Sequence, residues 1–341
     1  MDRVPSFTVV SGKEVHQAVS GHEVRVCQAV EAAYRLHGEG STVNPDSYFL
    51  RFPDRPSSRI IALPASVQGD VNVHGIKWIS SFPENVEAGI PRASAVLVLN
   101  DPETGYPFAC LESSIISAAR TAASAALAAA RLSEARGVRP RRVGFIGAGL
   151  IARYIHTYLR AVGLDFEAAG VHDLSAEYAA DFAGYLARHE DGEITVHDTA
   201  EELIRSCDLV VFATVAGEPH VTDPAWFAHN PLVLHISLRD LSPEIILGSY
   251  NVVDDVEHCL KANTSPHLAE QLAGNRDFVD GTLYDVLVGK TTPPADRPVV
   301  FSPFGLGVLD LAVAKYVYDE VTASGEALVV PDFFHELKRH G

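Results

Sequence analysis

Short apolar runs alternate with helical segments through the middle of the chain. Four of these runs have the length and composition of buried strands, and apolar residues recur at helical spacing between them. Strands that alternate with helices in this way form a parallel, doubly wound sheet. The runs are RVGFI (142–146), AAGVH (168–172), DLVVFAT (208–214) and LVLHIS (232–237). The pattern predicts an α/β domain.

The preceding part of the chain has a different pattern, in which most strand-like runs are separated by turns. Two early helices are expected, one capped by Ser11 and one over 21–37, and a polar loop is expected over 38–45. The strand-like runs are 6–10, 59–63, 73–79, 95–99 and 106–111. This pattern predicts an α+β domain.

Two further helices connect these regions. Residues 112–136 are Ala-rich without Gly or Pro, and 305–321 carries apolar residues at helical spacing. Between 257 and 298 we expect short helical pieces and polar loops, with a last strand at 299–302. The end of the chain, from 327, is expected to pack back on the N-terminal domain. We therefore expect one domain from 1–125 plus 315–341 and a second from 126–314, and a homodimer built on the N-terminal sheet.

A glycine-rich turn follows the strand at 142–146 directly, in the order Gly147-Ala148-Gly149-Leu150-Ile151-Ala152. Gly147 permits a tight turn, Gly149 leaves room for a pyrophosphate, and Ala152 lets the next helix pack on the strand. The helix N-terminus offers N–H groups and a partial positive charge to phosphates. This unit predicts a Rossmann-type dinucleotide site. The alternative is a glycine turn with no cofactor.

Asp173 ends the second strand of this unit, about 20 residues after the glycine turn. A carboxylate there accepts hydrogen bonds from the adenosine ribose and repels a 2′-phosphate. Leu174 and Ser175 supply no arginine to offset that repulsion. The expected cofactor is therefore NAD rather than NADP.

Composition restricts the class of partner. The chain has 341 residues, 47% of them hydrophobic, and a net charge of −17. This charge has the wrong sign for nucleic acid or an anionic membrane. The start of the chain lacks a signal-peptide pattern and no apolar run is long enough to span a bilayer, so a cytoplasmic location is expected.

Cysteine and histidine patterns give no metal site. The four cysteines lack paired spacing and fit reduced thiols. The densest cluster of metal-binding residue types is 254–259, which lacks a metal motif, and a capped helix start explains it equally well.

Two ionisable residues are candidates for chemistry. Lys77 lies between apolar neighbours in VHGIKWIS, where it either binds a carboxylate or moves a proton, or else points to solvent. Asp240 follows the strand at 232–237 at the edge where ligands bind, and is either a general base or a loop residue that caps the next element.

Several arginines are candidates for binding an anion. Arg120, followed by Thr121, lies on the Ala-rich helix, where it either meets an anion or is an ordinary surface charge. Arg51, Arg59 and Arg92 lie on or beside the N-terminal strands, where each is open to the same two interpretations.

Five segments together resemble the ornithine cyclodeaminase/μ-crystallin family over nearly the whole chain. They are GIKW (75–78), NDPETGYP (100–107), ISAARTAA (116–123), GFIGAGLIA (144–152) and ISLRD (236–240). The resemblance implies an NAD-dependent enzyme and a dimer in which the N-terminal segment and C-terminal helix form a dimerisation and substrate domain. The closer likeness is to the branch that makes L-2,3-diaminopropionate for siderophores or peptide antibiotics. In that branch, NAD oxidises the secondary amine of an amino acid–glutamate conjugate, which yields 2-oxoglutarate as well.

The resemblance also implies roles for individual residues. Lys77 resembles the substrate lysine and Asp240 the acid/base aspartate. Arg51 resembles the arginine for the substrate carboxylate, although Arg59 is an alternative. Residues that resemble cofactor contacts are Arg120, Thr121, Gly147, Gly149, Leu150, Ile151, Ala152, Asp173, Thr214 and Ser237.

The chain departs from the cyclodeaminases of this family at three places. Arg92 adds a cation where they carry a neutral hydroxyl, so we expect it to bind substrate. Their lysine after the catalytic aspartate is absent from DLSPE, and Pro303 replaces the serine of their F-x-S-x-G motif. These departures favour the conjugate as substrate. The alternatives are an ornithine cyclodeaminase, a ketimine or imine reductase, and a non-enzymatic protein that binds NAD(P)H and a small ligand.

Overall fold

The computed structural model describes residues 6–335 and 337, so the first residues of the chain, used above to judge a signal peptide, lie outside it. Contacts divide the chain into two units. The first contains the residues up to Arg120 and those from Leu306 onward, and the second is Thr121–Gly305. The expected boundary between 314 and 315 would cut the helix α11 (Gly307–Ser324), which lies as a whole in the first unit.

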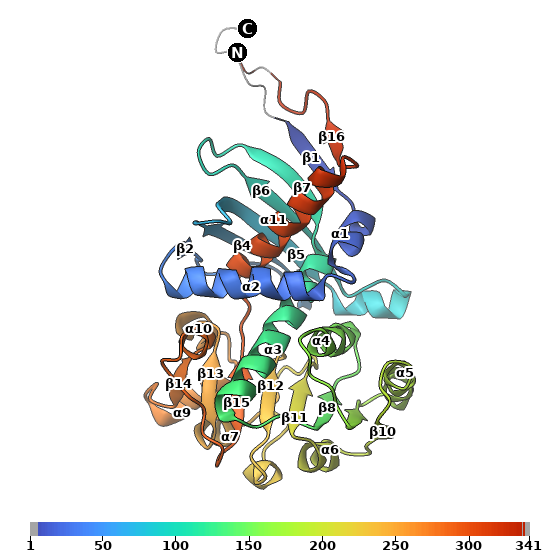
Figure 1. The fold of residues 1–341 in the computed structure, drawn as a ribbon, viewed down its shortest axis with the longest axis vertical. Coiled ribbons are helices and arrows are strands. Elements are labelled where there is room, and N and C mark those ends of the chain that lie inside the picture. Colours follow the sequence, from blue (N-terminus) through green and yellow to red (C-terminus); the bar gives the residue numbers. More distant parts are fainter. Residues whose placement is uncertain (1–5, 336, 338–341) are drawn as a thin grey trace. The chain divides into compact units, whose positions relative to one another are not determined.

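The first unit contains an eight-stranded mixed sheet in the order β16-β1-β7-β6-β5-β4-β2, with β3 paired to β4. Figure 1 shows α11 and α2 (Glu23–Gly38) together on this sheet, and α11 packs on α2, β4 and β5. The strands are β1 (Phe7–Val10), β2 (Thr42–Val43), β3 (Tyr48–Phe52), β4 (Arg55–Val67), β5 (Val73–Ser81), β6 (Ala93–Asn100), β7 (Pro107–Glu112) and β16 (Leu328–Val330). The remaining helical elements are α1 (Gly12–Val19) and the 3₁₀-helix η1 (Pro83–Ala88).

The predicted strands and caps of this unit are found, with three strands added, namely β2, β3 and β16. Ser11 caps α1 in a capping box with Glu14, and β16 pairs antiparallel with β1, which confirms that the chain end packs back on this unit. The expected loop over 38–45 is wrong in part, because β2 lies inside it and pairs with β4. β3 was not predicted, because it is a mostly exposed strand whose position depends on its partner β4.

The second unit contains the predicted parallel sheet, in the order β10-β9-β8-β11-β12-β15-β13-β14 with every pair parallel. The strands are β8 (Arg142–Ile146), β9 (Ala168–His172), β10 (Glu193–Val196), β11 (Leu209–Phe212), β12 (Leu232–His235), β13 (Tyr250–Val253), β14 (Val279–Thr282) and β15 (Val299–Ser302). The order reverses between β8 and β11, which makes their carboxyl ends the place where a doubly wound sheet binds its ligand. The expectation of only helices and loops over 257–298 is wrong, because β14 lies there.

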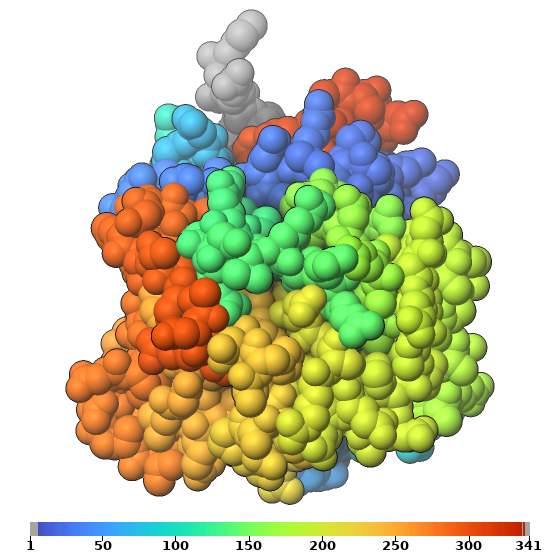
Figure 2. All heavy atoms as spheres, turned by 60° about the horizontal axis from the view of Figure 1, so that its bottom comes forward, coloured from blue at the N-terminus to red at the C-terminus, as the bar shows by residue number. Residues whose placement is uncertain are grey.

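Helices cover this sheet. They are α4 (Leu150–Ala161), α5 (Ala176–Leu186), α6 (Ala200–Ser206), η2 (Pro224–Phe227), α7 (Pro243–Leu247), α8 (Val256–Cys259), α9 (Ser265–Ala273) and α10 (Leu283–Leu287). The long helix α3 (Ser114–Arg136) begins in the first unit and ends in the second. Its end, green in Figure 2, lies against orange residues near 295, where Arg136 donates to the carbonyl oxygens of Asn230, Ala295 and Arg297. No helix in the described part of the chain is both long enough and apolar enough to cross a membrane.

Candidate functional site

The register of four neighbouring strands brings the predicted nucleotide residues to one edge of the second unit. Ile146 of β8 is the partner of both His172 in β9 and Phe212 in β11, and Phe212 is the partner of His235 in β12. Each of these residues ends its strand. Asp173, Gly147, Ala213 and Ile236 are the next residues along, so the loops that carry the candidate residues begin side by side.

The glycine turn has the geometry that its sequence predicts. Gly147 has φ +92°, and a Cβ there would lie 2.6 Å from the carbonyl oxygen of Ala213. A Cβ at Gly149 would meet no atom within 4 Å, so the space beside this backbone is open. Gly149 is also the N-cap of α4 and gives the helix no side-chain cap. The first turn of α4 therefore keeps N–H groups that a pyrophosphate can accept.

Asp173 is tied to the same turn. Its Oδ2 accepts the N–H of Ala148 at 2.8 Å and its Oδ1 accepts the N–H of Ser175 at 2.9 Å. Leu174 is fully exposed and brings no cation. A hollow of about 380 Å³ adjoins the turn, lined by Ala148, Gly149, Leu150, Arg153, Tyr178, Asp181, Phe182 and Tyr185. The residues present fit a dinucleotide whose ribose hydroxyls meet a carboxylate.

Asp240 is buried at the carboxyl end of β12 and accepts several hydrogen bonds. Thr214 donates its hydroxyl to Oδ1 at 2.5 Å, His220 Nε2 lies 3.1 Å from the same oxygen, and Ser237 donates its hydroxyl to Oδ2. Burial acts to raise the pKa of Asp240, but the hydrogen bonds from His220 and Ser237 outweigh it and hold that pKa below its ordinary value. The carboxylate is therefore charged. Its hydrogen bonds exclude the alternative in which Asp240 only caps the next element.

The Thr214 and Ser237 hydroxyls, predicted as cofactor contacts, are directed at Asp240 in this structure. His235, in β12, lies on the other side of the carboxylate and is fully buried. Its Nε2 lies 3.1 Å from the backbone nitrogen of Asp240 and 3.3 Å from Asp240 Oδ2, and its Nδ1 lies 3.3 Å from Ser302 Oγ. His235 is thus a buried support for the Asp240 loop. Neither His220 nor His235 was predicted, since a lone histidine in a loop or strand carries no motif.

Lys77 is buried in the first unit, which excludes the alternative in which it points to solvent. Its Nζ donates to Asp310 Oδ2 at 2.6 Å and to Ser117 Oγ at 3.3 Å, and the residue is 1% exposed. Burial, together with the charge of Arg120, lowers the pKa of Lys77 to about 8 against the opposing effect of Asp310. The ammonium keeps a third N–H that these two contacts do not use.

Asp310, in the first turn of α11, is the partner that both predicted cations share. Arg120 Nε donates to Asp310 Oδ1 at 3.0 Å, and the Asp310 side chain has no exposed surface. Arg120 is therefore not a surface charge. One carboxylate between two cations leaves one positive charge in a buried place, which is suited to an anion. Sequence analysis missed Asp310, although an aspartate within the apolar run GVLDLAV signals a buried, paired charge.

The remaining predicted arginines meet at one end of the first sheet. Arg51 is the cross-strand partner of Arg59, Arg59 is the partner of Ser81, and Arg92 Nη1 donates to Ser81 Oγ at 3.1 Å. Ser81 lies four residues after Lys77 in β5, so this set is on the face that carries Lys77. Thr121, expected to act with Arg120, lies across the unit division, and their joint cofactor contact stays a prediction.

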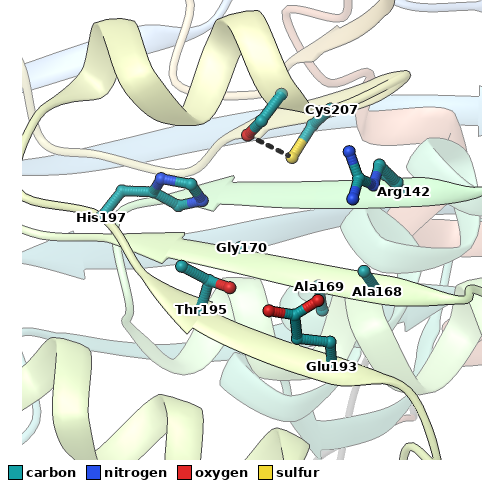
Figure 3. A pocket seen from close by; sticks show the side chains of 9 residues that line it. Arg142, Ala168, Ala169, Gly170, Glu193, Thr195, His197 and Cys207 are labelled. Carbon is teal, nitrogen blue, oxygen red and sulfur yellow. Dashed lines mark hydrogen bonds between the residues drawn. The ribbon is translucent and has the colours of Figure 1, made fainter.

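A smaller cavity of about 110 Å³ lies elsewhere in the second unit (Figure 3). It is lined by Arg142, Ala168, Ala169, Gly170, Glu193, Thr195, His197, Ser206 and Cys207. Six of these nine residues belong to β8, β9 and β10, and none of them is a predicted site residue. Burial raises the pKa of Cys207 to about 11, so its thiol stays protonated and unreactive.

The acidic cluster at 254–259 has a structural role. Asp254 accepts the backbone N–H groups of Asp255, Phe304 and Gly305, and Asp255 caps α8. Among the described residues, no group of three or more His, Cys, Asp or Glu side chains is arranged to hold a metal ion. All four cysteines are free.

Comparisons with known proteins agree on one family. The model of the ornithine cyclodeaminase/mu-crystallin family matches residues 8–325. The N-((2S)-2-amino-2-carboxyethyl)-L-glutamate dehydrogenase of Staphylococcus aureus is 28% identical over 320 residues, which are 90% of this chain and 93% of that protein.

Solved structures give the same result. The Delta(1)-pyrroline-2-carboxylate reductase of Thermococcus litoralis, in complex with NADH and L-proline, has a TM-score of 0.87 and 25% identity, with 95% of this chain and 100% of that chain covered. An archaeal alanine dehydrogenase dimer with bound NAD has a TM-score of 0.85 and 28% identity, with 96% and 100% covered.

Proposed function

Because the chain belongs to the ornithine cyclodeaminase/mu-crystallin family, we propose that it is an NAD-dependent enzyme that oxidatively cleaves N-(2-amino-2-carboxyethyl)-L-glutamate. The products are L-2,3-diaminopropionate and 2-oxoglutarate. NAD-dependent oxidation is the part supported by several relatives, since the pyrroline-carboxylate reductase and the alanine dehydrogenase were both solved with the cofactor. When bound, NAD⁺ supplies the acceptor for a hydride. The choice of substrate depends on this chain's own cations.

The observation that supports this choice of substrate is the set of cations on one face of the first sheet. Arg51 and Arg59 lie in register with Ser81, and Arg92 donates to it, on the side of the sheet where Lys77 and Arg120 share Asp310. In a protein with a net charge of −17, such a set is suited to a polyanion. The conjugate carries three carboxylates, whereas ornithine, alanine and proline carry one.

The residues have separate tasks in this proposal. Lys77, charged below a pH of about 8, binds a substrate carboxylate with its third N–H, while Arg51 and Arg92 bind the others. Asp240 supplies the negative charge that favours loss of the proton from the substrate amine, since a protonated nitrogen has no lone pair to expel a hydride. The glycine turn and Asp173 bind the dinucleotide.

A homodimer is the assembly that we propose. Support comes from the sheet face opposite Lys77, where Trp78 and Val96 are cross-strand partners and are 42% and 44% exposed. Exposed apolar side chains that are neighbours on a sheet are typical of an interface. The archaeal alanine dehydrogenase relative was solved as a dimer.

The substrate is tested by incubating the protein with NAD⁺ and, separately, the conjugate, L-ornithine, L-alanine or L-proline, with NADH absorbance and product mass as readouts. We expect 2-oxoglutarate and L-2,3-diaminopropionate from the conjugate and slow or no reaction from the others. Asp240→Asn is expected to abolish turnover and to bind NAD⁺ normally. Proline and ammonia from ornithine, with no 2-oxoglutarate from the conjugate, would overturn the proposed substrate. A protein that binds NADH but turns over none of these compounds would favour the non-enzymatic alternative.

A further inference from the structure

Two backbone contacts fix His220 against Asp240. The N–H groups of His220 and Val221 both donate to the carbonyl oxygen of Asp240, at 3.0 and 2.9 Å. Val221 and Leu241 also form an isolated parallel bridge. The loop after β11 is therefore fastened to the loop after β12. These backbone contacts therefore hold the His220 ring close to the Asp240 carboxylate.

The geometry of the pair assigns the ring protons. The charged Asp240 carboxylate can only accept, so the His220 Nε2 at 3.1 Å from Oδ1 donates to it. A neutral His220 ring then carries its lone pair on Nδ1, which has no hydrogen-bond partner among the described residues. The His220 side chain is 45% exposed, whereas that of Asp240 has no exposed surface.

The surroundings of Asp240 make it a poor proton acceptor. Thr214 and His220 occupy Oδ1 and Ser237 occupies Oδ2, so three of the roughly four acceptor positions of the carboxylate are filled. A proton that came to rest on Asp240 would break one of these bonds in a buried place. The exposed nitrogen of His220 has no such cost.

We propose that Nδ1 of His220 is the atom that takes the proton from the substrate amine, and that Asp240 is the positioning residue that orients the ring and stabilises its protonated form. This inference rests on the proposed function and identifies the base of that reaction. The arrangement is that of a histidine base with a buried aspartate behind it, with the two ring nitrogens in exchanged roles compared with the serine protease triad.

The proton balance of the reaction requires such a group. The secondary ammonium of the substrate loses one proton to Nδ1, and its C–H bond electrons then leave as a hydride to NAD⁺ while the nitrogen lone pair forms the C=N⁺ bond. Water adds to the carbon of this iminium, both protons of the added water pass in turn to the nitrogen, and the C–N bond breaks to give a ketone and a primary ammonium. One proton per turnover remains on His220, from which it leaves to solvent.

Other ionisable groups near the pair are already engaged. His235 lies against the Asp240 backbone nitrogen and faces Ser302, and Arg239 donates to the carbonyl oxygen of Ala262. Among the described residues, His220 is thus the ring in contact with Asp240 that keeps an unengaged nitrogen.

The first experiment compares His220→Ala, His220→Gln and the control His229→Gln with the unsubstituted protein, using NAD⁺ and the conjugate. Gln can donate to Asp240 but offers no basic nitrogen, and the ring of His229 donates to the carbonyl oxygen of Cys207, away from Asp240. We expect kcat to fall about 100-fold in both His220 variants, and imidazole to restore at least about tenfold in His220→Ala. The affinity for NAD⁺ and the melting temperature are expected to stay unchanged, and His229→Gln is expected to stay within about twofold.

The pH profile separates the base from a structural support. The acid limb of kcat/KM in the unsubstituted protein is expected to disappear from the residual activity of His220→Gln. Full activity in His220→Gln with the acid limb retained, or His220→Ala that imidazole does not restore, would overturn the assignment.

A second measurement does not depend on turnover. The hydrogen-bonded Nε2–H of His220 is expected to give a downfield proton resonance in the NAD-bound protein. The resonance is assigned to His220 by its loss in His220→Gln, and we expect it to be lost in Asp240→Asn as well. If the protein turns over none of the tested compounds, the proposed function fails, and this resonance alone tests the contact between His220 and Asp240. Absence of the resonance would overturn the inference, and its presence would support the contact.

Discussion

At the scale of single residues, two buried aspartates have opposite surroundings. Asp310 is shared by two full cations, Lys77 and Arg120, so its charge is more than neutralised. Asp240 is surrounded by hydroxyls and imidazoles and has no full cation bonded to it. The charge of Asp240 therefore remains available to stabilise a positive charge that forms during a reaction, whereas the charge of Asp310 is used to position two side chains.

The Asp310 cluster gives a test of stability. Asp310→Asn is expected to lower the free energy of unfolding at pH 7 by about 3 kcal/mol or more, because it leaves two buried cations without their shared anion. The matched control is Asp319→Asn on the same helix, which loses only an ion pair with Lys315 in which its own side chain is 55% exposed and is expected to change stability by under about 1 kcal/mol. Urea titration measures both. Equal and small decreases in the free energy of unfolding of the two variants would contradict the stabilising role of the Asp310 cluster.

At the scale of elements, the glycine turn and the end of β9 act as one piece. Asp173 closes it by accepting the N–H of Ala148, so the residue that we expect to discriminate between cofactors also holds the turn. The carboxylate therefore has two separable properties, its negative charge and its acceptor oxygen.

Two substitutions separate these properties. Asp173→Asn keeps an acceptor for Ala148 and is expected to weaken NAD⁺ binding moderately while relaxing discrimination against NADP⁺, because repulsion of the 2′-phosphate is lost. Asp173→Ala also removes the acceptor and is expected to weaken both cofactors further. Dissociation constants for NAD⁺ and NADP⁺ measure this, with the exposed Asp165→Ala as control. Tighter binding of NADP⁺ than of NAD⁺ by the unsubstituted protein would refute the interpretation.

At the scale of the whole molecule, we expect the face of the first sheet that carries Trp78 and Val96 to form the interface of the proposed homodimer. Val96→Glu places a charge at the centre of this face and is expected to shift the protein from dimer to monomer at micromolar concentration, because a buried unpaired carboxylate opposes association. The control is Val196→Glu on β10 of the second unit, since Val196 is 47% exposed and Val96 is 44% exposed. Light scattering gives the mass. A monomeric unsubstituted protein would rule out the homodimer.

The sequence alone determined most of the elements and the nucleotide turn of the second unit. Apolar runs at 142–146, 168–172, 208–214 and 232–237 predict strands because burial on both faces demands apolar residues throughout. Gly147 and Gly149 could also be interpreted from the sequence, because a tight turn and a close approach of a phosphate to the backbone each exclude a side chain. Short or exposed strands such as β2, β3 and β14 escaped prediction because they depend on their partners more than on their own residues.

Only the tertiary structure decided how the charges are paired. Lys77 and Asp310 are 233 residues apart, so no local pattern connects them, and the sequence left Lys77 open between core and solvent. The same holds for His220, whose contact with Asp240 depends on two loops that the parallel register of β11 and β12 brings side by side. Local periodicity indicates which apolar residues are buried, whereas the burial and the partner of a charged residue depend on the pairing of strands and helices that are distant in the chain.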